Sequence, residues 1–217
     1  MSLFSSVTAK PWVQAPIEEL PAPGRLPAPT PRVGLGVFLA VASMLFLLMS
    51  SAYFMRMAEP DWRPMPEPGV LWLNTLILVA SSAALHWSWV NVRNGDLARA
   101  RAGFLAAGLC AVAFLAGQLV AWRQLDALGY FLATNPANTF FYLLTALHGL
   151  HLLGGLVAWV RTASKLRRVH EARQARLSVE LCALYWHFLL LVWVGLFALL
   201  LMDNSGKLGM GGMHHAP

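Results

Sequence analysis

Five long apolar stretches dominate this sequence and restrict the folds that are open to it. They run from Val33 to Met55, Val70 to Val92, Gly103 to Trp122, Thr139 to Val160 and Leu181 to Met202. Each has about the 20 residues that a helix needs to cross a bilayer. Only 12% of the residues are charged, whereas soluble globular proteins carry about a quarter. We therefore predict an all-α, polytopic membrane protein, a bundle of five transmembrane helices.

The two ends of the chain differ in composition from the apolar middle. Residues 1–32 are so rich in proline that they cannot form a packed helix, and we expect an extended arm there. The five-helix transmembrane domain is predicted over 33–203, and a flexible tail over 204–217. Within the tail, Met210-Gly-Gly-Met-His-His215 resembles a weak copper-binding string. Disorder is the favoured interpretation of that string, and copper binding is the alternative.

Basic residues are distributed unequally between the two sides of the predicted bundle. Of the 16 Lys and Arg residues, three lie in 1–32, three in 93–101 and six in 161–176, all on one side. Loops on the cytoplasmic side of a membrane carry an excess of Lys and Arg. This predicts a cytoplasmic N-terminus and a periplasmic C-terminus.

The fourth apolar stretch carries polar residues at membrane depth. Thr145, His148, His151 and Gly155 follow one another at helical spacing, so they share one face. Polar groups at that depth are costly and normally face protein, and Gly or Thr lets another helix approach closely. This helix is therefore predicted to be buried among the others.

Further polar and aromatic residues in the other stretches suit hydrogen bonds between helices. They are Asn74, Thr75, His86, Gln118, Tyr185, Trp186 and His187. No Asp or Glu lies deep in any stretch, because Glu180 and Asp203 fall at the edges. Proton-driven transporters usually need an intramembrane carboxylate. We therefore favour interhelical packing over transport as the role of this set, with His187 in the seam against the fourth helix.

Four histidines at membrane depth raise the alternative of a bound metal or haem, because neutral imidazole is a common ligand. His148 and His151 share one helix, so each needs a partner such as His187 or His86 from another. No acidic or cysteine side chain completes such a site, and Cys110 and Cys182 show no metal-ligand spacing. We predict no metal site, no catalytic residue and no cofactor bound by this chain itself.

The order of several motifs resembles subunit III of haem-copper respiratory oxidases in its short, five-helix form. The most specific motifs are Thr145-Ala-Leu-His-Gly-Leu-His151 and Tyr185-Trp-His-Phe188, which is followed by Val192-Trp193. Leu73-Asn-Thr75 at the start of the second stretch and Gln118 in the third also fit. The resemblance extends over about residues 34 to 202.

This resemblance implies a non-catalytic subunit of a bacterial inner-membrane oxidase that serves aerobic respiration. It implies oxidase subunits I and II as partners, haem and copper in the partner, and cytochrome c as an indirect electron donor. Structural phospholipids are implied too, and Arg161, Lys165, Arg167 and Arg168 are candidate partners for lipid phosphates. We expect no nucleic-acid partner, because the basic residues lie in loops between the apolar stretches.

Two departures from the family pattern bear on function. The family often carries a glutamate in its first helix, where this chain reads Val41-Ala-Ser-Met-Leu45, and an acid where Leu190 stands. Both departures argue against direct proton handling and leave the scaffold and lipid roles. A subunit III of a quinol oxidase and a nitric oxide reductase-associated protein of the same family are the alternatives.

Overall fold

The computed structural model describes residues 30–63, 69–131 and 135–210, with side chains over 31–63, 69–131 and 135–203. These residues form five helices: α1 (Thr30–Arg56), α2 (Val70–Arg93), α3 (Leu97–Ala127), α4 (Pro136–Arg168) and α5 (Ala172–Met210). All five are long and apolar enough to cross a membrane, and the described ranges contain no strand. The predicted all-α fold with five spanning helices is confirmed.

The helix ends differ from the predicted boundaries. α1 begins at Thr30, inside the predicted arm, and α5 continues to Met210, inside the predicted tail. The rest of the arm, and all but the first residue of the Met/His string, lie outside the described residues. The extra helical turns lie beyond the apolar stretches. They cost little free energy, because outside the membrane the unpaired backbone groups of a helix end can bond to water or to side chains.

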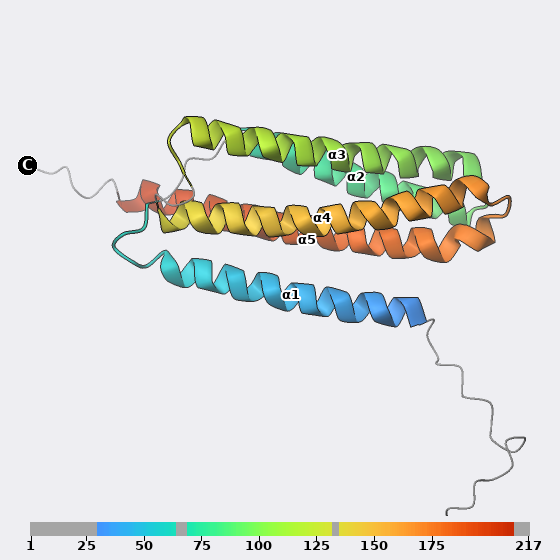
Figure 1. The fold of residues 1–217 in the computed structure, drawn as a ribbon, viewed down its shortest axis with the longest axis horizontal. Coiled ribbons are helices and arrows are strands. Elements are labelled where there is room, and N and C mark those ends of the chain that lie inside the picture. The colour runs from blue at the N-terminus through green and yellow to red at the C-terminus, as the bar shows by residue number, and fades with distance from the viewer. Residues whose placement is uncertain (1–29, 64–68, 132–134, 211–217) are drawn as a thin grey trace, which may run out of the picture.

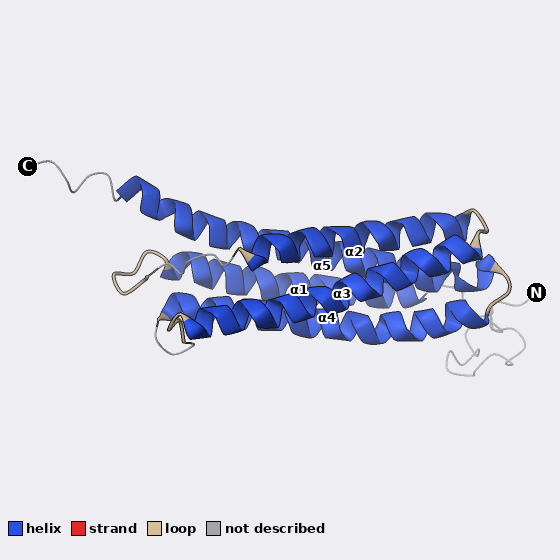
Figure 2. Ribbon diagram, turned by 90° about the horizontal axis from the view of Figure 1, so that it is seen from above, coloured by secondary structure: helices blue, strands red, loops and turns tan. Residues whose placement is uncertain are grey.

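Helices that follow one another in the chain run antiparallel, along one long axis, while α1 and α5 run parallel (Figures 1 and 2). α4 and α5 lie in the middle of the bundle, α2 and α3 lie on one side of them, and α1 lies on the other (Figure 1). α2 packs most extensively against α3, while α5 contacts α1, α2 and α4. α1 is the least buried span and exposes most of its apolar side chains. Because the number of spans is odd, the described chain starts and finishes at opposite ends of the bundle.

One end, which we call the basic end, holds the start of α1 and the α2–α3 and α4–α5 connections. Arg32 of α1 forms an ion pair with Glu180 of α5, in which one guanidinium nitrogen, Nη2, donates to both carboxylate oxygens at 2.8 and 3.0 Å. Arg101 of α3 donates to the carbonyls of Leu166 and Val169, both at 3.0 Å, where α4 ends. These contacts join α1 to α5 and α3 to α4, and they satisfy carbonyls that the end of α4 would leave unpaired.

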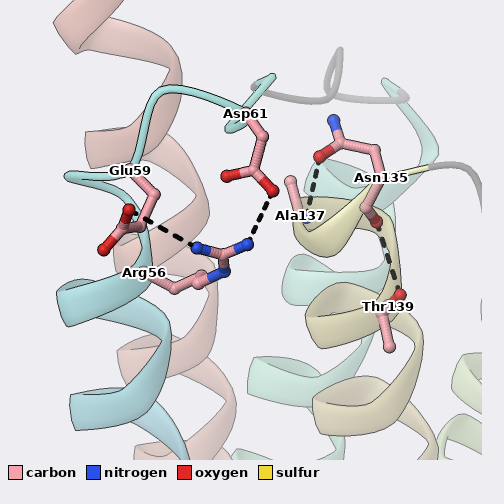
Figure 3. Close-up of polar contacts among 6 residues, drawn as sticks. All are labelled: Arg56, Glu59, Asp61, Asn135, Ala137 and Thr139. Atoms are coloured by element: carbon pink, nitrogen blue, oxygen red, sulfur yellow. Dashed lines mark hydrogen bonds and ion pairs between the residues drawn. The ribbon is translucent and has the colours of Figure 1, made fainter.

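The opposite end is closed by polar contacts around the α1–α2 connection (Figure 3). Arg56 lies 3.8 Å from Glu59 and 2.6 Å from Asp61. Asn135 caps α4 by accepting a hydrogen bond from the amide of Ala137 at 3.2 Å, and its side-chain amide donates to the carbonyl of Arg63. The same asparagine therefore starts α4 and fixes the segment after α1 beside it.

Candidate functional site

The candidate site is the polar interior of the bundle, formed by the polar and aromatic side chains that α2 to α5 turn toward one another. Its buried polar members are Asn74, Ser81, Ser82, Ser88, Gln118, Thr145 and His148.

Asn74 and Gln118 join α2 to α3. Both side chains are buried, and Asn74 Nδ2 donates to Gln118 Oε1 at 3.4 Å. The contact requires Gly117, because a Cβ at that position would collide with the amide oxygen of Asn74. Asn74 Oδ1 and Gln118 Nε2 have no further hydrogen-bond partner among the described residues. The pair is thus a single weak hydrogen bond that depends on close approach of two backbones.

Tryptophan side chains supply several of the polar links between helices. Trp193 of α5 donates to Thr75 of α2 at 3.0 Å, and Trp186 donates to Ser81 at 2.9 Å. Trp122 of α3 donates to Thr145 of α4 at 3.2 Å. Trp122 and Trp193 have the amphipathic side chain of an interfacial residue, but these two indoles bond between helices. The spacing of residues in the sequence does not predict these hydrogen bonds. An indole N–H needs only one acceptor, and any helix that packs beside it can supply one.

His148 lies at the centre of the interior with none of its surface exposed. Aromatic rings surround it: Trp193 at 5.2 Å, Phe114 at 5.8 Å and Phe46 at 6.5 Å between ring centroids. Neither ring nitrogen has a hydrogen-bond partner among the described residues. The expected burial of His148 is observed, but the expected interhelical hydrogen bond from its imidazole is not. The ring fills an aromatic cage contributed by α1, α3 and α5.

His151 and Gly155 form the seam between α4 and α5. Tyr185 donates its hydroxyl to the carbonyl of His151 at 2.8 Å, while the His151 imidazole bonds to the carbonyl of Leu147 in its own helix. Gly155 lies against the Tyr185 ring, since a Cβ there would be 2.6 Å from Cε1. The glycine lets α5 approach α4 closely enough for this hydrogen bond to form.

His86 and His187 lie elsewhere than the other two histidines. Both side chains are exposed on the outside of this chain, along the seam between α2 and α5. Their ring centroids are 5.6 Å apart, and His187 Nδ1 lies 2.6 Å from the Ser82 hydroxyl. His187 was expected in the seam against α4. It pairs with α2 instead, because its neighbours Tyr185 and Trp186 occupy the faces of α5 that α4 and the interior use.

A buried carboxylate was missed at the sequence level because it lies at the edge of an apolar stretch. Asp203 is only 3% exposed. Its two oxygens accept hydrogen bonds from the Tyr53 hydroxyl at 2.9 Å and from Trp62 Nε1 at 2.8 Å. This cluster ties α1 and the segment after it to the far end of α5. Charge-assisted hydrogen bonds of this kind compensate a carboxylate for the loss of water.

A groove opens between α1 and the seam of α4 and α5, toward the basic end. Its volume is about 430 Å³, and its walls include Leu35, Phe38, Gly154 and Ala158, with Ser178 near its polar end. The groove is therefore apolar along most of its length and polar at one end.

The four predicted phosphate-binding side chains are all exposed near the basic end. Arg161 and Lys165 continue the helical row of Gly154 and Ala158, which line the groove. Lys165 Nζ lies 3.1 Å from the Ser178 hydroxyl at the polar end of the groove. Arg167 instead lines a small recess against α3, and Arg168 ends α4. Arg161 and Lys165 therefore lie on the groove side of α4, whereas Arg167 faces α3.

The donor set of the interior does not resemble a metal centre. Among the described residues, no group of three or more His, Cys, Asp or Glu side chains gathers closely enough to hold an ion. Cys182 is buried beside Thr162 at 3.5 Å, and Cys110 is half-buried. The interior consists of hydrogen bonds between uncharged groups and of contacts between aromatic rings. These interactions fix the helices relative to one another.

Known proteins resemble this chain over most of its length. A family model for cytochrome c oxidase subunit III matches residues 30–204. The cytochrome c oxidase subunit 3 of Synechocystis sp. is 36% identical over 175 residues, which cover 76% of this chain and 72% of that protein. That of Thermostichus vulcanus is 32% identical, with 77% and 85% covered. A probable cytochrome c oxidase subunit 3 of Nocardia farcinica is 30% identical, with 76% and 84% covered.

Proposed function

The chain belongs to the cytochrome c oxidase subunit III family, and from this premise we propose that it is a non-catalytic subunit of a bacterial haem-copper terminal oxidase. As a subunit III it is a multi-pass membrane protein that associates with other oxidase subunits. Its proposed role is to stabilise the catalytic subunit during electron transfer to dioxygen. The observation that carries the proposal is the family match across all five helices.

The described interior supports a structural role for this chain. Its fully buried polar side chains, such as Asn74, Ser81 and His148, are neutral amides, hydroxyls and an imidazole. Asp203, the buried carboxylate, is held at one end of the bundle by Tyr53 and Trp62. Neutral groups that pack together or hydrogen-bond to one another set helix positions without moving charge. We propose that haem and copper reside in a partner, as oxidase subunits I and II would provide.

Purification of the complex tests this proposal. The full chain is given an affinity tag after Pro217 and isolated in mild detergent from membranes of a cell that makes the complete complex. We expect a haem- and copper-containing partner in a constant ratio to the tagged chain, together with oxygen consumption driven by reduced cytochrome c. Isolation of the chain alone would overturn the proposal. Activity with quinol only, or with nitric oxide in place of oxygen, would identify one of the two alternative complexes.

We also propose that the groove beside α1 holds an acyl chain of a structural phospholipid. Its apolar walls suit hydrocarbon, while Arg161 and Lys165 stand on the same helical row at its polar end. A cation near the membrane surface contributes about 1 kcal/mol toward an anionic lipid. Glu180, also near this end, is neutralised by Arg32 and so does not repel a phosphate.

The lipid proposal is tested by measuring the phospholipid retained in the purified complex. We expect Arg161→Gln combined with Lys165→Gln to lower the tightly bound phospholipid per complex. Arg167→Gln removes one positive charge from the α3 side of the same helix, so it is the matched control for Arg161→Gln and Lys165→Gln measured singly beside the double variant. Equal retention in the double variant and the control would contradict the assignment.

The proposed location is a bacterial inner membrane, with the basic end in the cytoplasm. The excess of Lys and Arg at that end supports this orientation. A periplasm-specific reporter fused after Pro217 is expected to be active. An active cytoplasmic reporter at the same position would reverse the orientation.

A further inference from the structure

Two imidazoles face outward from this chain within the depth of the membrane. His86 lies seven residues before the end of α2 at Arg93, and His187 lies six residues after the start of the apolar part of α5 at Leu181. At 1.5 Å per residue, each is about 10 Å inside its end of the apolar span. Residues around them on the same faces are apolar and exposed: Ala83 on α2, and Leu184 and Leu191 on α5.

The hydrogen bonding of this pair is incomplete. The Ser82 hydroxyl makes one hydrogen bond among the described residues, to His187 Nδ1 at 2.6 Å. A serine hydroxyl that donates here makes Nδ1 the acceptor and places the proton of a neutral imidazole on Nε2. His86 contacts the rings of Trp89 and His187, and it makes no hydrogen bond among the described residues. The pair therefore presents unused hydrogen-bonding nitrogens to whatever lies outside.

Acyl chains cannot meet that demand, because hydrocarbon offers no hydrogen bond to a polar group. Polar side chains at this depth normally face protein or a water-filled cavity. Ala83, one turn from His86, is small enough to let another helix approach the seam closely. Two imidazoles are also fewer than the three or four protein ligands of an ordinary zinc site.

We infer that a transmembrane helix of another subunit covers the seam between α2 and α5 and presents an oxygen-bearing side chain, a carboxyl, amide or hydroxyl group, to His86 and His187. The inference rests on the proposed function, because it requires a partner subunit in the membrane. Beyond that function, the inference specifies the face of this chain that the partner covers and the kind of side chain that the partner presents to it. The seam is separate from the lipid groove, which lies between α1 and the α4–α5 seam.

A photo-crosslinking experiment locates the partner. Benzoylphenylalanine replaces Leu184, one turn from His187 and 51% exposed, in the tagged chain within the complete complex, so that both histidines are kept. After irradiation we expect a covalent product with another subunit. Products with lipid alone, or with a second copy of this chain, would overturn the inference. If the wild-type chain carries no partner at all, the proposed function itself has failed, and the two failures are thereby distinguished.

Paired variants test the hydrogen bonds themselves. The double variant His86→Leu with His187→Leu keeps the surface apolar but removes the ring nitrogens. We expect the loss of two intramembrane hydrogen bonds to weaken the affinity for the partner subunit about tenfold. His86→Gln with His187→Gln restores an N–H donor and a carbonyl acceptor, and we expect retention in the complex close to wild type. Retention of the leucine pair at the wild-type level would overturn the inference. So would stoichiometric metal in the wild-type complex that is lost from both pairs.

Discussion

Gly155 offers the sharpest test of how α4 and α5 pack. Alanine at this position would place its Cβ 2.6 Å from Tyr185 Cε1, 3.1 Å from Cδ1 and 3.3 Å from Trp186 Cζ3. Carbon atoms attract best at about 3.5–4.0 Å, so the Tyr185 ring would have to move by about 1 Å. The ring is held at its far end by the 2.8 Å hydrogen bond to the His151 carbonyl, and Trp186 is fully buried beside it.

The magnitude follows from those two constraints. Overpacking of a well-packed interior costs about 1–3 kcal/mol, and a lost hydrogen bond adds about 0.5–1.5 kcal/mol when the ring moves away. We expect Gly155→Ala to lower the free energy of unfolding by about 1–3 kcal/mol, because part of the strain relaxes. Gly154→Ala is the matched control. It makes the same backbone change one residue earlier, where a Cβ meets no atom within 4 Å.

The assay is unfolding of the purified chain in mixed micelles as the denaturing detergent fraction rises, followed by tryptophan fluorescence. The quantity of interest is the difference between the two alanine variants, in which the effect of alanine on the helix backbone cancels. In a Tyr185→Leu background the penalty at position 155 should shrink, as expected for residues in direct contact. Equal stability of the two alanine variants would refute the packing described here.

Three further predictions concern contacts between other helices. Gly117→Val is expected to destabilise the chain by about 1–3 kcal/mol in the same unfolding assay, because the new side chain displaces Asn74. Trp186→Phe removes the donor to Ser81 and should cost about 0.6–1.7 kcal/mol, which are the average and the maximum found for intramembrane hydrogen bonds; no change would mean that the bond adds nothing. Arg32→Gln breaks an ion pair that is about half exposed at the arginine, so we expect a loss of less than about 1 kcal/mol that disappears in high salt. A larger loss that persists in salt would show that Arg32 acts through something other than this pair.

Helix number and position were predictable because they follow from one local quantity. A stretch of about 20 apolar residues has no stable alternative to a helix in lipid, whatever its neighbours are. The burial of Thr145, His148 and Gly155 was predictable for the same reason: their spacing defines one face, and lipid disfavours polar groups. The exact helix ends were not, since polar turns outside the bilayer carry no comparable penalty.

The partners of individual side chains could not be read from spacing. Helical periodicity places His187 on a face of α5, but which helix meets that face depends on the order of helices around the bundle. In the structure α5 contacts α1, α2 and α4, and His187 falls beside α2. The partners of Asp203 could not be predicted from the sequence for the same reason. Its burial depends on Tyr53 and on Trp62 beyond the end of α1, two residues that are about 150 and 141 positions away.

The way hydroxyl groups are used in the interior bears on the proposed scaffold role. Thr75, Ser81 and Thr145 each accept a hydrogen bond from an indole of another helix. Each of the three also donates its own proton to a backbone carbonyl, at 2.8, 2.7 and 2.7 Å. A proton relay needs hydroxyls whose protons can be handed on, whereas these protons are committed to main-chain acceptors. Because indoles carry a single donor and a large apolar body, such pairs join helices tightly without introducing charge, which is what the proposed scaffold role requires.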